Sequence, residues 1–312
     1  MKNRIFCGMA FLTLLSACSS EDSTSGKVSN TEMTVHTIQV NDKVITRAGF
    51  ETSLNSKTIG LYVAGTGYIP SSYSTCTITA GGVAGAVTNP VYLLGTAHVY
   101  GFYPSASAIL SPSAPTATSV LTGVSIRPTD TFGSTGQTDY MYATQDADVS
   151  KSAPAVDLTF HHALSKLSFV VNSINYDGAG ALTQVKMTDK GSGSKFLSSD
   201  ETGTMSIASG TFASLTATNV LTYNGTATIN KTAGTVGTTN TSVLAAPTTL
   251  PTISLTLTVD GTEYTADISS SVTAWAAGKE YIYTITISNE AITVTNVSTQ
   301  DWTSGGTGAV TM

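Results

Sequence analysis

Alternation of apolar and polar residues with a period of two is the clearest pattern in this chain, and it predicts β-strands. The residues 253–259 (ISLTLTV) alternate, Asp260-Gly261 follows, and the alternation resumes over 262–268 (TEYTADI). Aspartate and glycine tolerate the positive φ angles that a two-residue hairpin turn requires. The sequence therefore predicts a β-hairpin with its turn at Asp260-Gly261.

Other segments show the same period along most of the chain. They are TIGLYVAG (58–65), VYLLGTAHVYGFYP (91–104), VDLTF (156–160), LSFVV (167–171), KEYIYTITIS (279–288) and AITVTNV (291–297). In the segment 279–288, Tyr281, Tyr283, Ile285 and Ile287 fall on one face of the predicted strand. Few segments show a helical period, so these patterns predict an all-β fold.

Composition agrees with the strand pattern. The chain of 312 residues contains 54 threonines, and branched side chains fit the pleated surface of a sheet. Its 28 glycines and nine prolines are scattered in the way that turns require. The formal net charge of −6 excludes the broad basic surface that a nucleic-acid-binding protein presents.

The first 17 residues have the pattern of an export signal. Lys2 and Arg4 precede an apolar run of eleven residues, 5–15 (IFCGMAFLTLL), which is too short to span a bilayer. The run leads into Leu-Ser-Ala-Cys at 15–18, which resembles the lipobox of bacterial lipoproteins. The resemblance implies cleavage before Cys18 and lipid attachment to its sulfur, and thus membrane anchoring in the precursor. An ordinary signal peptide that contains a cysteine is the alternative.

A polar tether at 18–27 follows the signal, because this stretch has no apolar pattern. Glu21 and Asp22 within it resemble the acidic export signals of Bacteroidetes surface lipoproteins. About 290 residues then remain, which suit two domains of ordinary size. The polar segment 144–155 (TQDADVSKSAPA) separates two sets of strands, and we expect the boundary there, between domains at 28–155 and 156–312.

The cysteines predict no internal disulfide. Cys7 leaves with the signal and Cys18 carries lipid, so Cys76 is alone in the mature chain. Its neighbours offer neither a histidine nor a basic setting, which a reactive cysteine needs. We expect Cys76 to be a small strand residue.

Two neighbouring histidines, His161 and His162, are the most tempting metal ligands. Successive side chains on a strand point to opposite faces, so the pair cannot hold one ion unaided. We expect one histidine to be inward and hydrogen bonded and the other outward; His36 and His98 are far away in sequence.

Acidic residues near the expected domain boundary are interpreted as solvated loop charges, with a calcium site as the alternative. They are Asp139, Asp146 and Asp148.

Three further features of the sequence bear on possible chemistry. The segment GSGSK (191–195) lacks the spacing of a phosphate-binding loop and is interpreted as a hairpin loop. Trp275 and Trp302 could stack a sugar, but packing in the core or at its rim is the favoured interpretation. No Ser-His-Asp arrangement follows from the spacing. The sequence therefore predicts a protein that is not an enzyme and has no cofactor or metal.

The segment VDLTFHHALSKLSFVV (156–171) resembles the F-x-H-A-L-x-K-L signature of the fimbrillin-like proteins of the Bacteroidetes, the type V pilus subunits. The later segments LAAPTTLPTISLTLTVDGTEYTADI, WAAGKEYIYTITI and STQDW follow in the family's order. Together with the lipobox, the resemblance covers essentially the whole chain. It implies two tandem transthyretin-like β-sandwich domains, and a structural role in a fimbria at the outer membrane and cell surface that supports adhesion.

The same resemblance gives a role to an isolated arginine in NDKVITRAGFE (41–51). It implies that an arginine- or lysine-specific protease cuts between Arg47 and Ala48. The preceding residues, Val35 to Thr46, alternate enough to form an edge strand, whose loss would leave a groove for a strand from the next subunit. The alternative is an exposed arginine in a turn.

Three roles within a fimbria are compatible with the sequence. Stalk, anchor and tip subunits all fit, and the segment 290–312, which ends in the glycine-rich TSGGTGAVTM, is either a donor strand or a last loop and strand. The expected partners are other pilus subunits, the processing protease and a host or bacterial surface ligand. One alternative function is a lipid-anchored or tip adhesin, or a glycan-binding surface protein, that does not polymerise. Another is a structural surface lipoprotein without an assigned partner.

Overall fold

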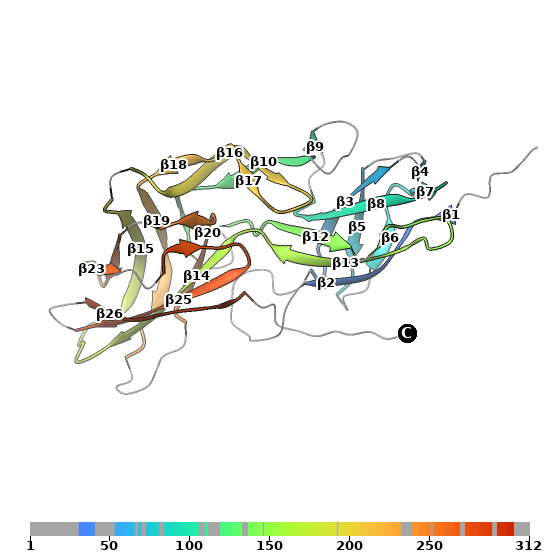
Figure 1. Cartoon of the computed structure of the whole chain (residues 1–312). Coiled ribbons are helices and arrows are strands. Elements are labelled where there is room, and N and C mark those ends of the chain that lie inside the picture. The colour runs from blue at the N-terminus through green and yellow to red at the C-terminus, as the bar shows by residue number, and fades with distance from the viewer. Residues whose placement is uncertain are drawn as a thin grey trace, which may run out of the picture.

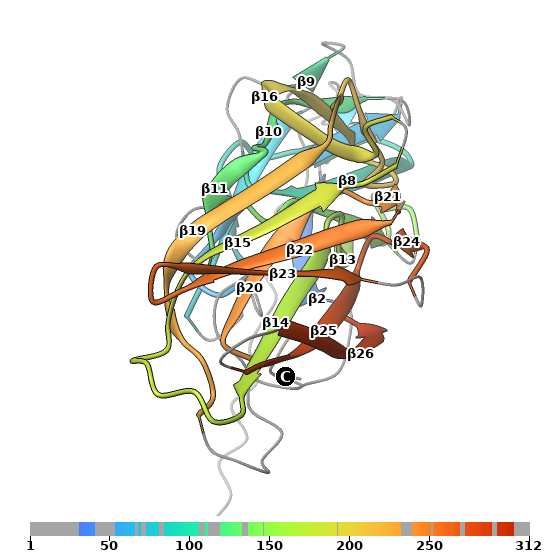
Figure 2. The same ribbon diagram turned by 90° about the vertical axis from the view of Figure 1, so that its left-hand side faces the viewer.

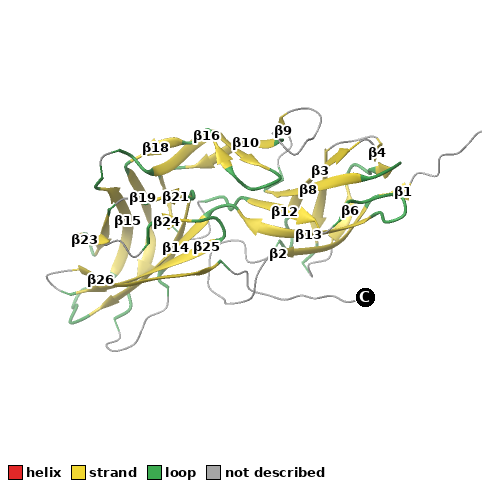
Figure 3. Ribbon diagram, viewed as in Figure 1, coloured by secondary structure: helices red, strands yellow, loops and turns green. Residues whose placement is uncertain are grey.

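The computed structural model describes most of the chain after residue 30. The described residues are 31–40, 54–65, 68–69, 73–80, 84–105, 110–111, 119–132, 137–145, 147–191, 193–231, 239–250, 252–268, 272–288 and 292–302. Every regular element among them is a β-strand (Figure 3). The all-β prediction is therefore confirmed. Within this part of the chain no helix has the length and apolar character that crossing a bilayer requires.

The first half of the sequence builds a seven-stranded sheet, here called the N-terminal sheet, with the strand order β2-β13-β12-β8-β3-β5-β6 (Figure 1). A small sheet has the order β1-β7-β4, and Leu93 of β7 packs in the same buried cluster as residues of the N-terminal sheet. The strands of this half are β1 (Thr31–Glu32), β2 (Thr34–Val40), β3 (Thr58–Gly65), β4 (Tyr68–Ile69), β5 (Tyr73–Ile78), β6 (Ala84–Val87), β7 (Tyr92–Leu93), β8 (Ala97–Tyr103), β9 (Leu110–Ser111), β10 (Val120–Ile126), β11 (Thr129–Thr131), β12 (Met141–Gln145) and β13 (Ala155–His162).

The second half supplies two larger sheets and a small pair, β21-β24. The five-stranded C-terminal sheet has the order β11-β19-β15-β22-β23, and the four-stranded C-terminal sheet has the order β20-β14-β25-β26 (Figure 2). The strands are β14 (Ser165–Ser173), β15 (Ala181–Asp189), β16 (Phe196–Ser206), β17 (Phe212–Ala213), β18 (Thr216–Thr218), β19 (Val220–Thr228), β20 (Thr241–Ala245), β21 (Thr248–Thr249), β22 (Ile253–Val259), β23 (Thr262–Ile268), β24 (Ala274–Trp275), β25 (Lys279–Ile287) and β26 (Ile292–Asp301).

The two C-terminal sheets pack face to face as a β-sandwich. Alternate residues of β14 and β25 from one sheet, such as Phe169 and Tyr283, meet alternate residues of β15 and β22 from the other, such as Val185 and Leu257. These side chains are buried because successive residues of a strand face opposite sides, so the apolar set of each strand points inward. The predicted inward face of β25 lies in this core.

The predicted hairpin is also present. β22 and β23 pair in antiparallel register from Ile253–Ile268 to Val259–Thr262, and the turn residues Asp260 and Gly261 have φ angles of 49° and 81°. Both values lie in the left-handed region that the turn requires.

One further sheet joins the two halves of the sequence. In this bridging sheet, with the order β17-β16-β10-β9, β10 from the first half pairs with β16 from the second; β18 also pairs with β16. β11 crosses likewise and pairs with β19. A buried cluster lies at this junction and contains side chains of the N-terminal sheet (Tyr62, Phe102), the bridging sheet (Leu121, Met205) and Trp302.

The domain division at residue 155 stays a prediction, as does the transthyretin-like topology. The hydrogen bonding constrains where such a boundary can lie. β13, which begins at the expected boundary, pairs with both β2 and β12 of the N-terminal sheet, and its Val156, Leu158 and Phe160 lie in the core of that sheet. This pairing favours a boundary after His162.

Candidate functional site

Strand β2 lies at an edge of the N-terminal sheet, and among the described strands it pairs with β13 (Figure 1). The pairing is parallel, with Val35 opposite Val156 and Ile38 opposite Leu158. Because β13 is the strand next to β2 in the described sheet, removal of β2 would break this pairing and make β13 the edge of the sheet.

The apolar side chains of β2 and of the residue before it help to cover the core. Met33 is 1% exposed, and its backbone N–H donates to the carbonyl of Val91 at 2.8 Å. Val35, Ile38 and Val40 are partly buried against the cluster that contains Leu158 and Phe160. Removal of this segment would therefore expose apolar surface together with the backbone groups of β13.

The polar side of β2 is attached to β13 by one carboxylate. The Oδ1 atom of Asp157 accepts a hydrogen bond from the Thr37 hydroxyl at 2.5 Å and lies 2.9 Å from Nδ1 of His36. The Thr37 hydroxyl, and after it His36, hold the pKa of the Asp157 carboxyl below its ordinary value. These contacts stabilise the ionised form of the Asp157 carboxyl, so this group is charged at neutral pH.

We expect acid to weaken this attachment. A carboxyl group whose pKa is lower in the folded state stabilises that state above its ordinary pKa, near pH 4, and loses this contribution as the pH falls through the lowered value. Asp157→Asn should therefore reduce the loss of stability below about pH 4, and should lower stability at pH 7 by at most about 1 kcal/mol, because the pair is exposed. Urea unfolding from pH 2 to 7 measures both effects.

Asp267→Asn is a matched control for this prediction. Asp267 lies on β23 with Lys190 as its partner, which holds the pKa of that carboxyl below its ordinary value. Replacement of Asp267 should change how stability depends on pH below about pH 4, but it should not loosen β2 from the sheet. Limited proteolysis of the N-terminal segment measures how firmly β2 is held. Equal effects of the two variants on β2 would contradict the role of Asp157.

The residues predicted for processing fall outside the described part of the chain. These are the lipid-attachment residue Cys18 and both sides of the predicted cleavage site, Arg47 and Ala48. Of the predicted strand Val35 to Thr46, the described portion is extended up to Val40 and is an edge strand, as the alternation predicts. The structure thus describes the strand but not the bond that would release it.

The two neighbouring histidines point to opposite sides, as predicted. His161 lies 3.1 Å from the Thr144 hydroxyl and stacks on Tyr142, whereas His162 is buried. Nδ1 of His162 lies 3.0 and 3.2 Å from the two carboxylate oxygens of Asp139, and its ring stacks on Trp302 at 3.7 Å between centroids. Across the described residues, no three His, Cys, Asp or Glu side chains converge as metal ligands would.

The interpretation of Asp139 as a solvated loop charge is wrong. Asp139 is 4% exposed, because its carboxylate pairs with the ring of His162, which is itself buried. Asp148 is exposed and pairs with His98 at 2.7 Å, as a surface charge would, and Asp146 lies outside the described residues.

The interpretation of 191–195 as a hairpin loop is also wrong. The strands on either side, β15 and β16, belong to different sheets, so this loop crosses between sheets.

Trp275 and Trp302 are each 2% exposed, in agreement with a packing role. Cys76 is a buried residue of β5, and burial raises the pKa of its thiol.

Sequence reasoning missed Met33 and Asp157 as parts of this site. Asp157 occupies a polar position of the alternating run VDLTF, which marks it as outward-facing but gives no partner. The partner depends on a parallel pairing between strands about 120 residues apart, which no local pattern encodes.

The geometry defines an all-β protein of packed sheets whose N-terminal strand occupies a sheet edge. A comparison with protein-family models then identifies the family: the model described as fimbrillin-like matches residues 28–302, so the chain belongs to the fimbrillin-like family. A comparison with curated proteins found no significant match.

Several solved structures share this fold. A candidate cell adhesion protein from Bacteroides uniformis is 21% identical, with a TM-score of 0.60 over 87% of this chain and 99% of that one. A second candidate cell adhesion protein, from Bacteroides ovatus, is 18% identical, with a TM-score of 0.61 over 88% and 98%. A fimbrial protein from Bacteroides vulgatus is 15% identical, with a TM-score of 0.51 over 87% and 100%. At these identities the likeness concerns the fold.

Proposed function

We propose that this chain is a structural subunit of a cell-surface fimbria and that it supports adhesion. In this proposal it is exported as a lipoprotein precursor with lipid on Cys18, is cut between Arg47 and Ala48, and joins the next subunit by strand addition. The observation that carries the proposal is the attachment of β2, which among the described strands is hydrogen bonded to β13 at the edge of its sheet, yet covers part of the core. Membership of the fimbrillin-like family supports it.

The physical basis is the cost of an uncovered groove. A cut after Arg47 separates β1, Met33 and β2 from the rest of the chain, and each fully buried apolar side chain that is lost had contributed about 1.5–3 kcal/mol. The edge of β13 would also have unpaired backbone groups, each costing about 1–3 kcal/mol where it stays buried. A strand from a second copy offsets both costs, and a head-to-tail contact of this kind extends into a filament because it does not close.

The proposed donor is the glycine-rich end of the C-terminal segment 290–312, TSGGTGAVTM (303–312). The residues before it belong to the folded subunit, because β26 pairs with β25 at an edge of the four-stranded C-terminal sheet and Trp302 is buried. The proposed acceptor, the edge of β13 (Ala155–His162), is a different part of the chain from this donor, so one subunit can bind two neighbours.

The arginine content of the chain makes the cleavage test sharp. The sequence has three arginines: Arg4 within the export signal, Arg47, and Arg127, which precedes Pro128. Arg127 also pairs with Asp200. An arginine-specific protease therefore has one expected target in the mature chain. We expect it to convert the monomer into polymers that resist mild denaturant, as size-exclusion chromatography and negative-stain microscopy would show.

Two variants control this experiment. Arg47→Ala should block cleavage and assembly while leaving the unfolding midpoint unchanged. Arg47→Lys should resist the arginine-specific enzyme. A lysine-specific enzyme, under conditions that spare the other lysines, should restore cleavage and polymers for this variant. Cleaved protein that stays monomeric at high concentration would contradict polymerisation and favour a tip or adhesin role.

A further inference from the structure

A pocket of about 490 Å³ opens where the bridging sheet meets the four-stranded C-terminal sheet. Its walls come from β10 and the adjoining residues up to Asp130 of β11, from the segment before β12, from Leu164 before β14, and from single residues of β16 and β20. Its volume lies in the range of small-molecule sites. None of its lining residues belongs to β2 or β13, so the pocket is separate from the proposed assembly site.

The pairing of β10 with β16 is irregular at this pocket. The register shifts twice along β10, on either side of Val124, and Gly123 and Glu201 have φ angles of 70° and 58°. Residues other than glycine rarely adopt a positive φ angle. Bulges of this kind redirect side chains away from the regular pleat. Here the irregular pairing places Glu201 in the pocket wall.

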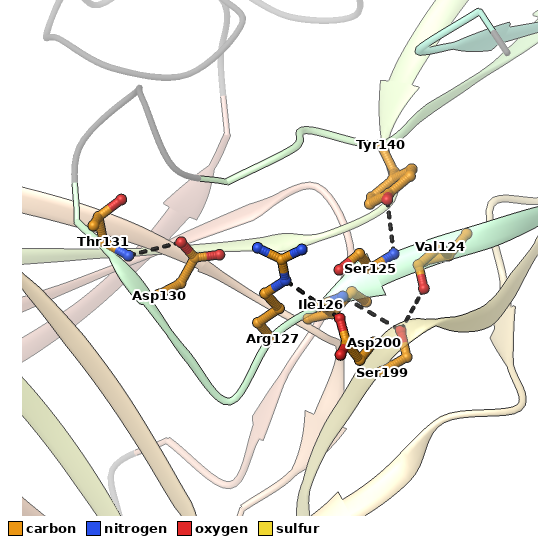
Figure 4. Close-up of polar contacts among 9 residues, drawn as sticks. All are labelled: Val124, Ser125, Ile126, Arg127, Asp130, Thr131, Tyr140, Ser199 and Asp200. Carbon is orange, nitrogen blue, oxygen red and sulfur yellow. Dashed lines mark hydrogen bonds and ion pairs between the residues drawn. The ribbon is translucent and has the colours of Figure 1, made fainter.

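Hydrogen bonds fix the surrounding backbone (Figure 4). The Ser125 N–H donates to the Tyr140 hydroxyl oxygen at 2.8 Å, and the Ser199 hydroxyl donates to the Val124 carbonyl at 2.6 Å. On the opposite wall, the Gln137 side chain makes two hydrogen bonds of 2.8 Å with the backbone of Leu244. The pocket is thus held in shape before any ligand arrives.

Charged groups of both signs lie in the wall and retain hydrogen-bonding capacity. Arg127 uses its Nε for a 3.4 Å contact with Asp200, and the Oδ1 of Asp130 accepts from the Thr131 N–H at 2.8 Å (Figure 4). Among the described residues, the two terminal nitrogens of Arg127 and the carboxylate of Glu201 have no hydrogen-bond partner. The pocket therefore offers donors and acceptors side by side, above a floor that includes the buried residues Ile126, Leu164 and Leu244.

We propose that this pocket binds a neutral saccharide unit. A sugar hydroxyl both donates and accepts, so one ring can bond to the Arg127 guanidinium and to the carboxylates of Asp130 and Glu201 at once. Two carboxylates and one guanidinium give the wall a net charge of −1, which disfavours an anionic sugar. The Arg127 guanidinium in turn repels a cationic side chain of a peptide.

Ligand-observed NMR on the purified full chain tests this proposal. The probes are the methyl glycosides of galactose, mannose and N-acetylglucosamine, with N-acetylneuraminic acid as the anionic probe and the peptide Gly-Lys-Gly as the cationic one. We expect saturable binding of at least one neutral glycoside. Arg127→Met and Glu201→Gln should each weaken it about ten-fold or more, because hydrogen bonds to charged groups are the stronger kind.

Glu263→Gln, the same chemical change at an exposed position of β23 outside the pocket, should leave binding unchanged. Unaltered urea midpoints for all three variants would show that they fold. Absence of saturable binding to every neutral glycoside, preference for the anionic or the cationic probe, or binding that survives both pocket substitutions would each overturn the proposal. Because no step requires cleavage or assembly, failure of this test leaves the proposed polymerisation untouched.

Discussion

Replacing Trp302 by alanine should lower the free energy of unfolding by about 3–5 kcal/mol, the range for truncating a large buried aromatic side chain. The indole is 2% exposed and stacks on the buried ring of His162 with an angle of 9° between the planes. Its backbone N–H also donates to the Gly278 carbonyl at 2.8 Å, which fixes the end of β26. The truncation would therefore leave a cavity where the sheets of both halves meet.

Urea unfolding measures this loss, with far-UV circular dichroism and the emission of Trp275 as independent signals, since the chain has two tryptophans. Trp302→Phe keeps a ring over His162 and should lose less. Ile174→Ala is a control at a position that is 54% exposed, and should change stability by less than about 0.5 kcal/mol. A loss below about 1 kcal/mol for Trp302→Ala would show that the junction cluster does not depend on this ring.

Strand positions and faces were predictable from the sequence because the side-chain period is local. The hairpin at Asp260-Gly261 needs only its turn residues and its flanking alternation, and the inward tyrosines of β25 follow from every second residue being apolar. The edge strand β2 was visible in the same way.

Pairing between distant strands was not predictable by the same means. β14 pairs in parallel with β25, and β10 pairs with β16 across the expected domain boundary, so each register depends on tertiary packing. The two wrong interpretations have the same origin, because both depend on tertiary structure. Asp139 is buried because it pairs with the buried His162, and the loop 191–195 connects strands of two different sheets. The saccharide pocket, built from five separate segments, had no signal in any one of them.

A second large effect is expected at a buried ion pair on the four-stranded C-terminal sheet. Nζ of Lys166 lies 3.2 Å from Oε1 of Glu280, and the two side chains are 11% and 12% exposed. The same carboxylate accepts hydrogen bonds from the Ser168 hydroxyl at 2.5 Å and from the Gln300 amide at 2.7 Å. The pair thus links three neighbouring strands, β14, β25 and β26.

Lys166→Met should cost about 3–5 kcal/mol, because it leaves the Glu280 carboxylate buried without a compensating charge. Desolvation of a lone charge, rather than the loss of attraction alone, is the main source of this cost. The double variant Lys166→Met with Glu280→Leu removes both charges and should recover most of the stability, since an apolar pair of similar volume can replace a buried ion pair.

Urea unfolding of the two single variants and the double variant completes a double-mutant cycle. The cost of the double variant should be smaller than the sum of the single costs by at least about 2 kcal/mol. Additive costs would mean that the lysine and the carboxylate act independently, with the hydrogen bonds from Ser168 and Gln300 sufficient to hold the charge of Glu280 within the sheet.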